Sequence, residues 1–302
     1  MPYQYQQLPM NNLPSIPDVR LVGSVAVVGR PNSGKSSFVN TLIGEKVSIV
    51  SKRPQTTQRT THGIYTTNDL QIVFLDTAGI HLGNDRWNEA VNRHAAKSLE
   101  RASVILYFID RSRPYGTEER NIRTILDKVD KPIIPVLTKC DLDKRLDDGN
   151  IPENAIEMSN VDKSGFESII EAIRPHLETA PLLYDEDYYT DQDMYTRVSE
   201  VVREKLFREL DEELPYSVYV ETQHIQDSPD GARLDILAYI YAERDSQKAI
   251  IIGKNASFLV KIGTAARRDL EEIFGRHVML QLRVKTMPKW KKNDKIMEGL
   301  LE

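Results

Sequence analysis

Short apolar runs alternate with helical patterns through the first 180 residues. Val25 to Val28, Leu70 to Leu75 and Val104 to Ile109 are short and apolar, as buried strands are. Pro132 to Leu137 has the same character, and Asn154 to Met158 is a shorter candidate. Apolar residues between these runs recur at the spacing of one helix face; they are Phe38, Val39, Leu42, Ile43, Ile122, Ile125, Leu126, Val129, Ile169, Ile170 and Ile173. Strands alternating with helices predict an α/β domain with a mostly parallel sheet.

The second half of the chain has a different order of elements. Apolar residues from Val198 to Leu210 predict a helix, and the alternating patterns of Tyr216 to Thr222 and Arg233 to Glu243 predict two half-buried strands. Gln247 to Ile252 is a candidate for a further strand. The remaining expected elements are a loop between two helices at Gly253 to Ala256, a helix from Ala265 to Phe274 and a final strand from His277 to Lys285. These elements predict a second, α+β domain.

Two segments lie outside these patterns. Residues 1–20 are polar and contain prolines, and we interpret them as a disordered N-terminal tail. Residues 181–193 hold five acidic residues, three tyrosines and no base. We interpret this acidic segment as a linker between domains, although it could instead pack on one of them. The chain is therefore expected to divide into a first domain over residues 21–180 and a second over residues 194–302.

Composition and charge limit the classes of protein to which the chain can belong. The chain is 40% hydrophobic and 28% charged, as globular proteins are, with a net charge of −5. Residues 253–302 nevertheless hold 11 basic and 6 acidic residues, which favours a polyanionic partner. Cys140 is the single cysteine, so an intrachain disulfide is excluded and a reducing compartment is expected. No apolar run approaches the roughly 18 residues of a membrane span, and the N-terminus lacks the features of a secretory signal.

The stretch from Gly29 to Ser36, GRPNSGKS, directly follows the first predicted strand and fits the phosphate-binding template G-x-x-x-x-G-K-[ST]. Glycines let backbone N–H groups point at phosphate oxygens, and the helix that begins here adds its positive end. Lys35 is placed to reach the terminal phosphates, and Ser36 to ligate Mg²⁺. A glycine-rich turn with a chance lysine is the alternative. The strand before the loop and the amphipathic helix after it favour the phosphate site.

Two later loops are candidates for completing a magnesium site. Pro54 to Thr61 is rich in threonine, and is either a solvated connector or a switch whose hydroxyl and carbonyl join the magnesium ligands when a terminal phosphate is present. Asp76 ends an apolar strand, where a carboxylate can hold magnesium through a water, and the N–H of Gly79 can sense the terminal phosphate. A plain strand-ending turn is the alternative at Asp76. The spacing from the first loop and the apolar strand favour a function.

A third loop, Thr138-Lys139-Cys140-Asp141, ends the strand that starts at Pro132. The carboxylate of Asp141 can accept hydrogen bonds from both the ring N–H and the exocyclic amine of guanine, and adenine offers neither. The next short strand ends at Ser159-Asn160, which supplies a further loop. The sequence therefore predicts a site selective for guanine nucleotides.

These motifs, taken in order, resemble those of a known family. GRPNSGKS, PQTTQRT, DTAG, TKCD and the loop at Ser159 resemble a translation-factor-type GTPase domain. More narrowly, KVSIVSKRPQTTQRTTHGI and KAIIIGKNASFLVKIGTAARRDLEEIF resemble the Era GTPase family, over roughly Val22 to Trp290. The resemblance implies a P-loop GTPase domain with a mixed, mostly parallel sheet, followed by an α+β type II KH domain. The order of helix, two strands, two helices and strand in the second half is the type II KH order.

The resemblance also assigns roles to individual residues. It implies catalytic roles for Lys35, Thr57 and Gly79, and magnesium binding by Ser36, Thr57 and, through water, Asp76. The residues that match the nucleotide-binding motifs are Gly29, Arg30, Pro31, Asn32, Ser33, Gly34, Lys35, Ser36, Ser37, Asp76, Gly79, Thr138, Lys139, Asp141, Ser159 and Asn160. The chain departs from the family pattern at Ala78, Thr138 and Asn160, where proline, asparagine and alanine are usual.

A KH loop of the form G-x-x-G clamps a nucleic-acid backbone between two helices. Here Gly253-Lys254-Asn255-Ala256 has alanine at the second glycine position. Lys254 and Lys261 are expected to supply phosphate contacts, and Arg267, Arg268 and the lysines around Trp290 are further candidates. A plain helix-to-helix turn is the alternative, and the positive balance of the region favours RNA.

The resemblance implies GTP hydrolysis with GTP/GDP and Mg²⁺, and a potassium ion at Asn32. Intrinsic turnover is expected to be slow, because Ile80 stands where Ras-like enzymes have a water-orienting glutamine. The implied partner is small-subunit ribosomal RNA near its 3′ end, during assembly of that subunit. A monomer in the cytoplasm, with peripheral membrane association, is expected. The alternative is a KH-type RNA-binding module with a degenerate nucleotide switch; Asp141 argues against an ATPase.

Overall fold

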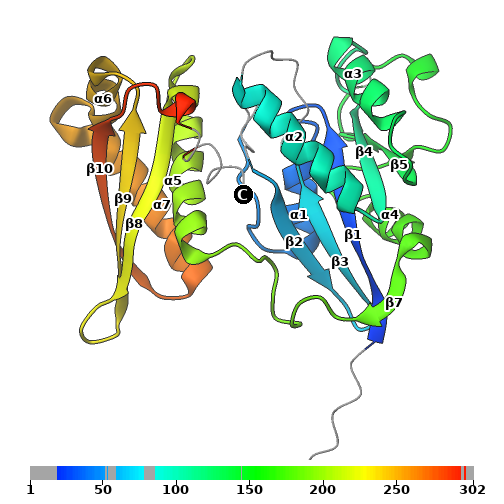
Figure 1. The fold of residues 1–302 in the computed structure, drawn as a ribbon, viewed down its shortest axis with the longest axis horizontal. Coiled ribbons are helices and arrows are strands. Elements are labelled where there is room, and N and C mark those ends of the chain that lie inside the picture. The colour runs from blue at the N-terminus through cyan, green and yellow to red at the C-terminus, as the bar shows by residue number, and fades with distance from the viewer. Residues whose placement is uncertain are drawn as a thin grey trace, which may run out of the picture.

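The computed structural model describes residues 19–51, 53, 59–77, 86–143, 145–293 and 296, without the side chains of residues 86–92, 94 and 148. Two sheets stand side by side, each with its own helices (Figure 1). The predicted N-terminal tail falls almost wholly outside the described residues. The first described residue, Val19, opens the central strand of the larger sheet.

The larger sheet has seven strands in the order β2-β3-β1-β4-β5-β6, and β7 also pairs with β1. Its strands are β1 (Val19–Gly29), β2 (Thr61–Thr66), β3 (Leu70–Asp76), β4 (Val104–Asp110), β5 (Ile133–Thr138), β6 (Ile156–Glu157) and β7 (Glu178–Pro181). β2 and β7 pair antiparallel with β3 and β1, and the other pairs are parallel. The predicted mixed, mostly parallel sheet is confirmed.

Helices cover both faces of this sheet (Figure 1). α1 (Lys35–Ile43) and α4 (Phe166–Ile173) pack on one face, and α2 (Arg86–Arg101) and α3 (Thr117–Leu126) on the other. Phe38 of α1 makes edge-to-face contacts with Phe74, Phe108 and Phe166, with ring centroids 5.7, 5.3 and 4.9 Å apart. Aromatic pairs of this geometry contribute about 0.5–1.5 kcal/mol each beyond burial. The helix that follows the glycine-rich loop is therefore locked to β3, β4 and α4.

The smaller sheet has three strands in the order β10-β9-β8, and α5 and α7 pack on one of its faces. Its elements are α5 (Met194–Glu209), β8 (Val218–Asp227), β9 (Arg233–Ala242), α6 (Asp245–Ile252), α7 (Ser257–Phe274) and β10 (His277–Thr286). β10 runs parallel to β9, and β8 antiparallel to it. The observed order of helix, two strands, two helices and strand is the predicted one. Gln247 to Ile252 is not a strand, however: it lies within α6, with only Ile251 buried.

The acidic segment lies on the first domain. Gln71 of β3 accepts hydrogen bonds from the backbone N–H groups of Leu183 and Tyr184, at 2.8 and 3.1 Å. Thr190 forms an antiparallel bridge with Gly63 of β2. Of the two arrangements that the sequence left open for this segment, these contacts match packing on a domain.

No single described helix is long and apolar enough to cross a bilayer. Asp245–Ile252 and Lys254–Phe274 reach that length and hydropathy only as a pair, bent by 42°.

Candidate nucleotide site and nucleic-acid interface

The glycine-rich loop leaves the carboxyl end of β1 and leads into α1. A side chain at Gly29 would place its Cβ 2.5 Å from the carbonyl oxygen of Phe108, so only glycine fits there. Gly34 has φ +97°, in the left-handed region, and a Cβ would lie 2.9 Å from Nδ2 of Asn160. Both glycines are thus required by the surrounding strands and loops. They leave the start of α1, whose first backbone N–H groups lie outside the hydrogen-bond ladder of the helix, open to an anion.

Lys35 is buried within the loop. Its ammonium donates hydrogen bonds to the carbonyls of Gly29 and Arg30, at 3.0 and 2.8 Å. Burial lowers the pKa of Lys35 to about 8, although the negative charges of Asp76 and Glu119 act to raise it. Phosphate oxygens carry more charge than carbonyls and are stronger acceptors for this ammonium. The loop therefore holds a cation ready where the sequence predicts the terminal phosphates.

Asp76 is the last residue of β3 and is completely buried. Burial raises its pKa, and the hydroxyls of Ser36 and Ser48 and the charge of Lys35 partly oppose this. Neither carboxylate oxygen has a hydrogen bond of standard geometry among the described residues. A buried carboxylate beside the Ser36 hydroxyl suits a magnesium ion with its bound waters. Thr57 and Gly79, the other predicted members of this site, lie outside the described residues.

The base loop stands beside the phosphate loop. Lys139 has φ +60°, and its ammonium pairs with Asp110 at 2.6 Å. The hydroxyl of Ser159 donates to Oδ1 of Asp141 at 2.6 Å, and Nδ2 of Asn160 donates to the carbonyl of Gly34 at 3.1 Å. Three predicted base-site residues are thus linked to one another or to the phosphate loop. Oδ1 of Asp141 is fixed on one side, which orients the carboxylate that the sequence assigns to guanine.

Arg30 turns away from the phosphate loop towards α3. Its Nε lies 2.5 Å from Oε2 of Glu119, and both side chains are buried. Burial raises the pKa of Glu119 above its ordinary value, and the nearby charge of Arg30 offsets only part of this rise. Nη1 of Arg30 also donates to the carbonyl of Pro114. The side chain of Arg30 therefore anchors the loop to Glu119 of α3 and to Pro114, and its predicted role in nucleotide binding stays a prediction.

The KH-like loop between α6 and α7 is exposed at Lys254 and Asn255. Gly253, Asn255 and Ala256 have φ values of +73°, +52° and +59°. Ala256 is left-handed without being glycine, which costs roughly 1–2 kcal/mol, whereas asparagine adopts this region readily. The loop is therefore strained at Ala256, and Lys254 beside it is exposed.

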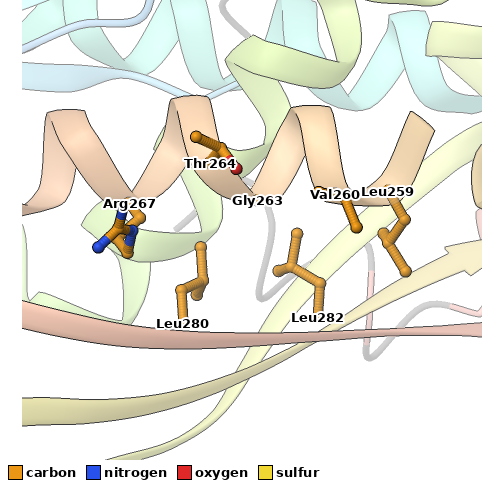
Figure 2. A pocket seen from close by; sticks show the side chains of 7 residues that line it. All are labelled: Leu259, Val260, Gly263, Thr264, Arg267, Leu280 and Leu282. Atoms are coloured by element: carbon orange, nitrogen blue, oxygen red, sulfur yellow. The ribbon is translucent and has the colours of Figure 1, made fainter. Parts of the chain in front are cut away.

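An open cavity of about 310 Å³ lies between α7 and β10 in the same domain (Figure 2). Leu280 and Leu282 of β10 face α7 across it, and Arg267 stands at one end. Arg267 also lies 3.6 Å from Glu271, and Arg268 is exposed. Lys261, which the sequence proposes as a phosphate contact, is ion-paired with Glu209 of α5. Lys261 and Arg267 are each paired with one acidic side chain but remain exposed, and Arg268 is exposed as well, so all three side chains can meet a polyanion.

Comparison with known proteins identifies the family. A family model described as 50S ribosome-binding GTPase matches residues 24–139, and a KH domain model matches residues 213–291. The chain is 41% identical over 295 residues to GTPase Era of Caldanaerobacter subterraneus subsp. tengcongensis, covering 92% of this chain and 96% of that protein. It is 37% identical over 285 residues to GTPase Era of Thermotoga maritima, covering 91% and 95%. The chain belongs to the Era family of GTPases.

Two solved Era structures match nearly the whole molecule. Era in complex with MgGDPNP and nucleotides 1506–1542 of 16S ribosomal RNA has a TM-score of 0.87 at 32% identity, covering 94% of this chain and 100% of that one. An Aquifex aeolicus Era variant bound to GDP and AlF4⁻ has a TM-score of 0.85 at 32% identity, covering 93% and 100%. The predicted family and fold are confirmed, and the chain is a GTP-hydrolysing enzyme of the Era family.

In this Era-family chain the two domains meet at the segment after α1. Nζ of Lys46 lies 2.5 Å from both Glu204 of α5 and Asp269 of α7. The N–H of Val50 donates to Glu204 at 3.1 Å, and Arg208 donates to the carbonyl of Val50 at 3.1 Å. The junction is therefore a network of charges and backbone groups. It lies a few residues before the threonine-rich loop.

Asp110 and Glu119 pair with Lys139 and Arg30 of the predicted nucleotide site but were not themselves predicted from the sequence. Asp110 ends β4 as Asp76 ends β3, so its position at the carboxyl end of a buried strand was an available signal. Glu119 gave no such signal, because an acidic residue in the first turn of a helix is explained by the helix dipole. Its partner Arg30 is 89 positions away in the sequence, and only the fold brings the two together.

Proposed function

We propose that this Era-family chain binds GTP and GDP with Mg²⁺ and couples slow GTP hydrolysis to the binding of small-subunit ribosomal RNA, in assembly of that subunit. The observation that carries the nucleotide half is the link between Asn160 and the carbonyl of Gly34, at 3.1 Å. It joins the loop that reads the base to the loop that holds the phosphates. Magnesium would be held by Ser36 and, through water, by Asp76, with Thr57 joining when a terminal phosphate is bound.

The RNA half of the proposal rests on the KH domain. The cavity between α7 and β10 offers leucine side chains for a base, and Arg267 and Lys254 offer charge for phosphates. Protein–RNA affinity depends strongly on such charges. The related Era structure that contains nucleotides 1506–1542 of 16S ribosomal RNA supports an RNA near the 3′ end of that molecule as the partner.

Several finer points belong to the same proposal. A potassium ion at Asn32 would supply positive charge that Ile80 cannot. The single cysteine supports a cytoplasmic location. We also propose that the protein associates peripherally with the membrane and that it is a monomer. We also propose domain boundaries at residues 21–180 and 194–302, with the acidic segment 181–193 between them.

A turnover assay with GTP and ATP in parallel tests the proposal, with and without an RNA that contains the 3′ end of the small-subunit molecule. We expect slow release of phosphate from GTP, faster in potassium than in sodium, and none from ATP. Equal rates in the two salts would contradict the proposed potassium site and leave the rest of the proposal standing. RNA binding without any GTP turnover would instead support the alternative of a KH module with a degenerate switch.

A further inference from the structure

The side chain of Asn160 reaches from the loop after β6 to the phosphate loop. Its Nδ2 donates to the carbonyl of Gly34 at 3.1 Å, and the same carbonyl accepts the backbone N–H of Phe38 at 2.9 Å. A Cβ at Gly34 would lie 2.9 Å from this Nδ2, so the two residues are also closely packed. The Gly34 carbonyl is therefore held from two sides, by α1 and by Asn160.

The carbonyl of Gly34 shares a planar peptide unit with the N–H of Lys35, and the two bonds point in opposite directions. Fixing the oxygen therefore fixes the direction of this N–H. It belongs to the first residue of α1, where backbone N–H groups have no acceptor within the helix. In a glycine-rich loop of this type, such N–H groups contact the α- and β-phosphates. The bond from Asn160 thus orients a donor to phosphate.

The backbone around Asn160 is held without its side chain. The N–H of Ser159 donates to the carbonyl of Ser164 at 3.2 Å, and the hydroxyl of Ser159 donates to Asp141 at 2.6 Å. The N–H of Val161 in turn donates to the Ser159 hydroxyl at 3.1 Å. Asn160 stands between these anchored neighbours, so removing its amide leaves the contacts of Asp141 in place.

The amide of Asn160 also has an unfavourable side. Its Oδ1 is buried and has no hydrogen bond of standard geometry among the described residues. A buried acceptor without a donor is destabilising. Alanine, the usual residue here in the Era family, would avoid this loss but would remove one of the two bonds to the Gly34 carbonyl. The amide therefore points to a role for its nitrogen.

We propose that Asn160 is a positioning residue for the phosphates of the nucleotide. Its amide nitrogen fixes the peptide unit between Gly34 and Lys35, so that the N–H of Lys35 is aimed at the β-phosphate. This inference rests on the proposed nucleotide site. It makes a residue of the loop beside Asp141 responsible for affinity towards phosphate and not for selectivity towards the base.

The test is Asn160→Ala, with displacement of a fluorescent GDP by unlabelled GDP, GMP and inosine diphosphate at constant magnesium. GMP lacks the β-phosphate, and inosine diphosphate lacks the exocyclic amine of guanine. We expect the affinity for GDP to fall about threefold to tenfold, the equivalent of one hydrogen bond, and the affinity for GMP to fall less than about twofold. The preference for GDP over inosine diphosphate should not change.

Asn154→Ala is the matched control, because Asn154 is an exposed asparagine two residues before β6. It should bind all three ligands as the parent does. Circular dichroism without nucleotide checks that both variants are folded as the parent is.

The other possible results each overturn the inference. A weaker preference for GDP over inosine diphosphate would mean that Asn160 acts on the base. An equal fall in affinity for GDP and GMP would mean a general loosening of the site, and unchanged affinities would mean no role. In all three cases the parent still binds GDP and the proposed function stands. If the parent does not bind fluorescent GDP, the proposed function itself is wrong and the inference fails with it.

Discussion

The two glycine-containing loops of this molecule, Gly29–Ser36 and Gly253–Ala256, place a lysine in very different surroundings. Lys35 is 6% exposed, and its ammonium is bonded to two loop carbonyls. Lys254 is exposed in a turn that is strained at Ala256. A buried cation is already oriented and only exchanges acceptors when a phosphate arrives. An exposed one must be ordered and is screened by salt. The first loop should therefore bind a defined ligand tightly, and the second a flexible polyanion weakly.

The largest effect should come from the buried lysine. Lys35→Ala should reduce GTP and GDP affinity at least about 100-fold, since charge-assisted hydrogen bonds contribute about 1.5–3 kcal/mol each and two phosphates are involved. Isothermal titration calorimetry at constant magnesium measures this. RNA binding by the same variant, measured without nucleotide, should stay at the parent level. If GTP affinity is unchanged, the phosphate-binding role of this loop is wrong.

The contacts at the junction between the domains determine whether the two glycine-containing loops keep a fixed distance and orientation. Lys46→Ala should lower the free energy of unfolding by about 2 kcal/mol at pH 7, because Glu204 and Asp269 lose a charged partner. Lys128→Ala, an exposed lysine on the first domain, is the control and should change stability little. Urea denaturation followed by circular dichroism compares the two variants.

The same junction has a predictable pH dependence. Burial raises the pKa values of Glu204 and Asp269, but Lys46 and neighbouring groups outweigh it, so both values are lowered. Carboxyl groups with lowered pKa stabilise the fold above their ordinary values, 4.5 and 3.8, and lose this contribution as the pH falls through the lowered values. The difference between Lys46→Ala and the parent should therefore shrink below about pH 4. A difference that stays constant down to pH 3 would exclude the ion-pair explanation.

The exposed lysine should give a smaller and salt-dependent effect. Lys254→Ala should weaken binding of single-stranded RNA and reduce the slope of log K against log salt by about 0.7, the value for one phosphate contact. Nucleotide affinity should not change. Fluorescence anisotropy across a salt series measures the slope. Parent-like binding at every salt concentration would mean that the loop is only a turn, and would direct attention to Arg267 and Arg268.

The smallest effect concerns backbone strain in the second loop. Ala256→Gly should raise the free energy of unfolding by up to about 1 kcal/mol, because the left-handed φ of +59° is costly for alanine and not for glycine. RNA binding should tighten if the backbone of the RNA approaches this residue closely. The thermal unfolding midpoint and the anisotropy assay measure the two effects. A lower midpoint would show that the strain at Ala256 is not relieved by glycine.

The sequence predicted the strands that lie in the protein interior. β1, β3, β4 and β5 are buried on both faces, so their apolar runs were clear. β2 was missed because it mixes polar and apolar residues beside the threonine-rich loop. Gln247 to Ile252 was a wrong candidate for a strand. Its three isoleucines favour a strand by propensity, but the fold places only Ile251 against the core and the segment is helical.

The candidate site likewise has a part that the sequence predicted and a part that it did not. Its loops were predictable because each phosphate or base contact requires particular residue types at fixed spacing within a few positions. The contacts that hold those loops join distant positions: Arg30 with Glu119, Asn160 with Gly34, and Lys46 with Glu204. No local pattern marks such pairs. They become visible only once the sheet and helices place them together.

Asp141→Asn tests most directly whether the first loop system reads guanine, which is the central claim about this protein. An amide would present a donor where guanine needs an acceptor, and a mismatched buried hydrogen bond costs about 1–3 kcal/mol. Titrating the parent and the variant with GTP and with xanthosine triphosphate should show the preference reversed in the variant. If the variant still prefers GTP as strongly as the parent does, Asp141 does not read the base and the proposed guanine site is wrong.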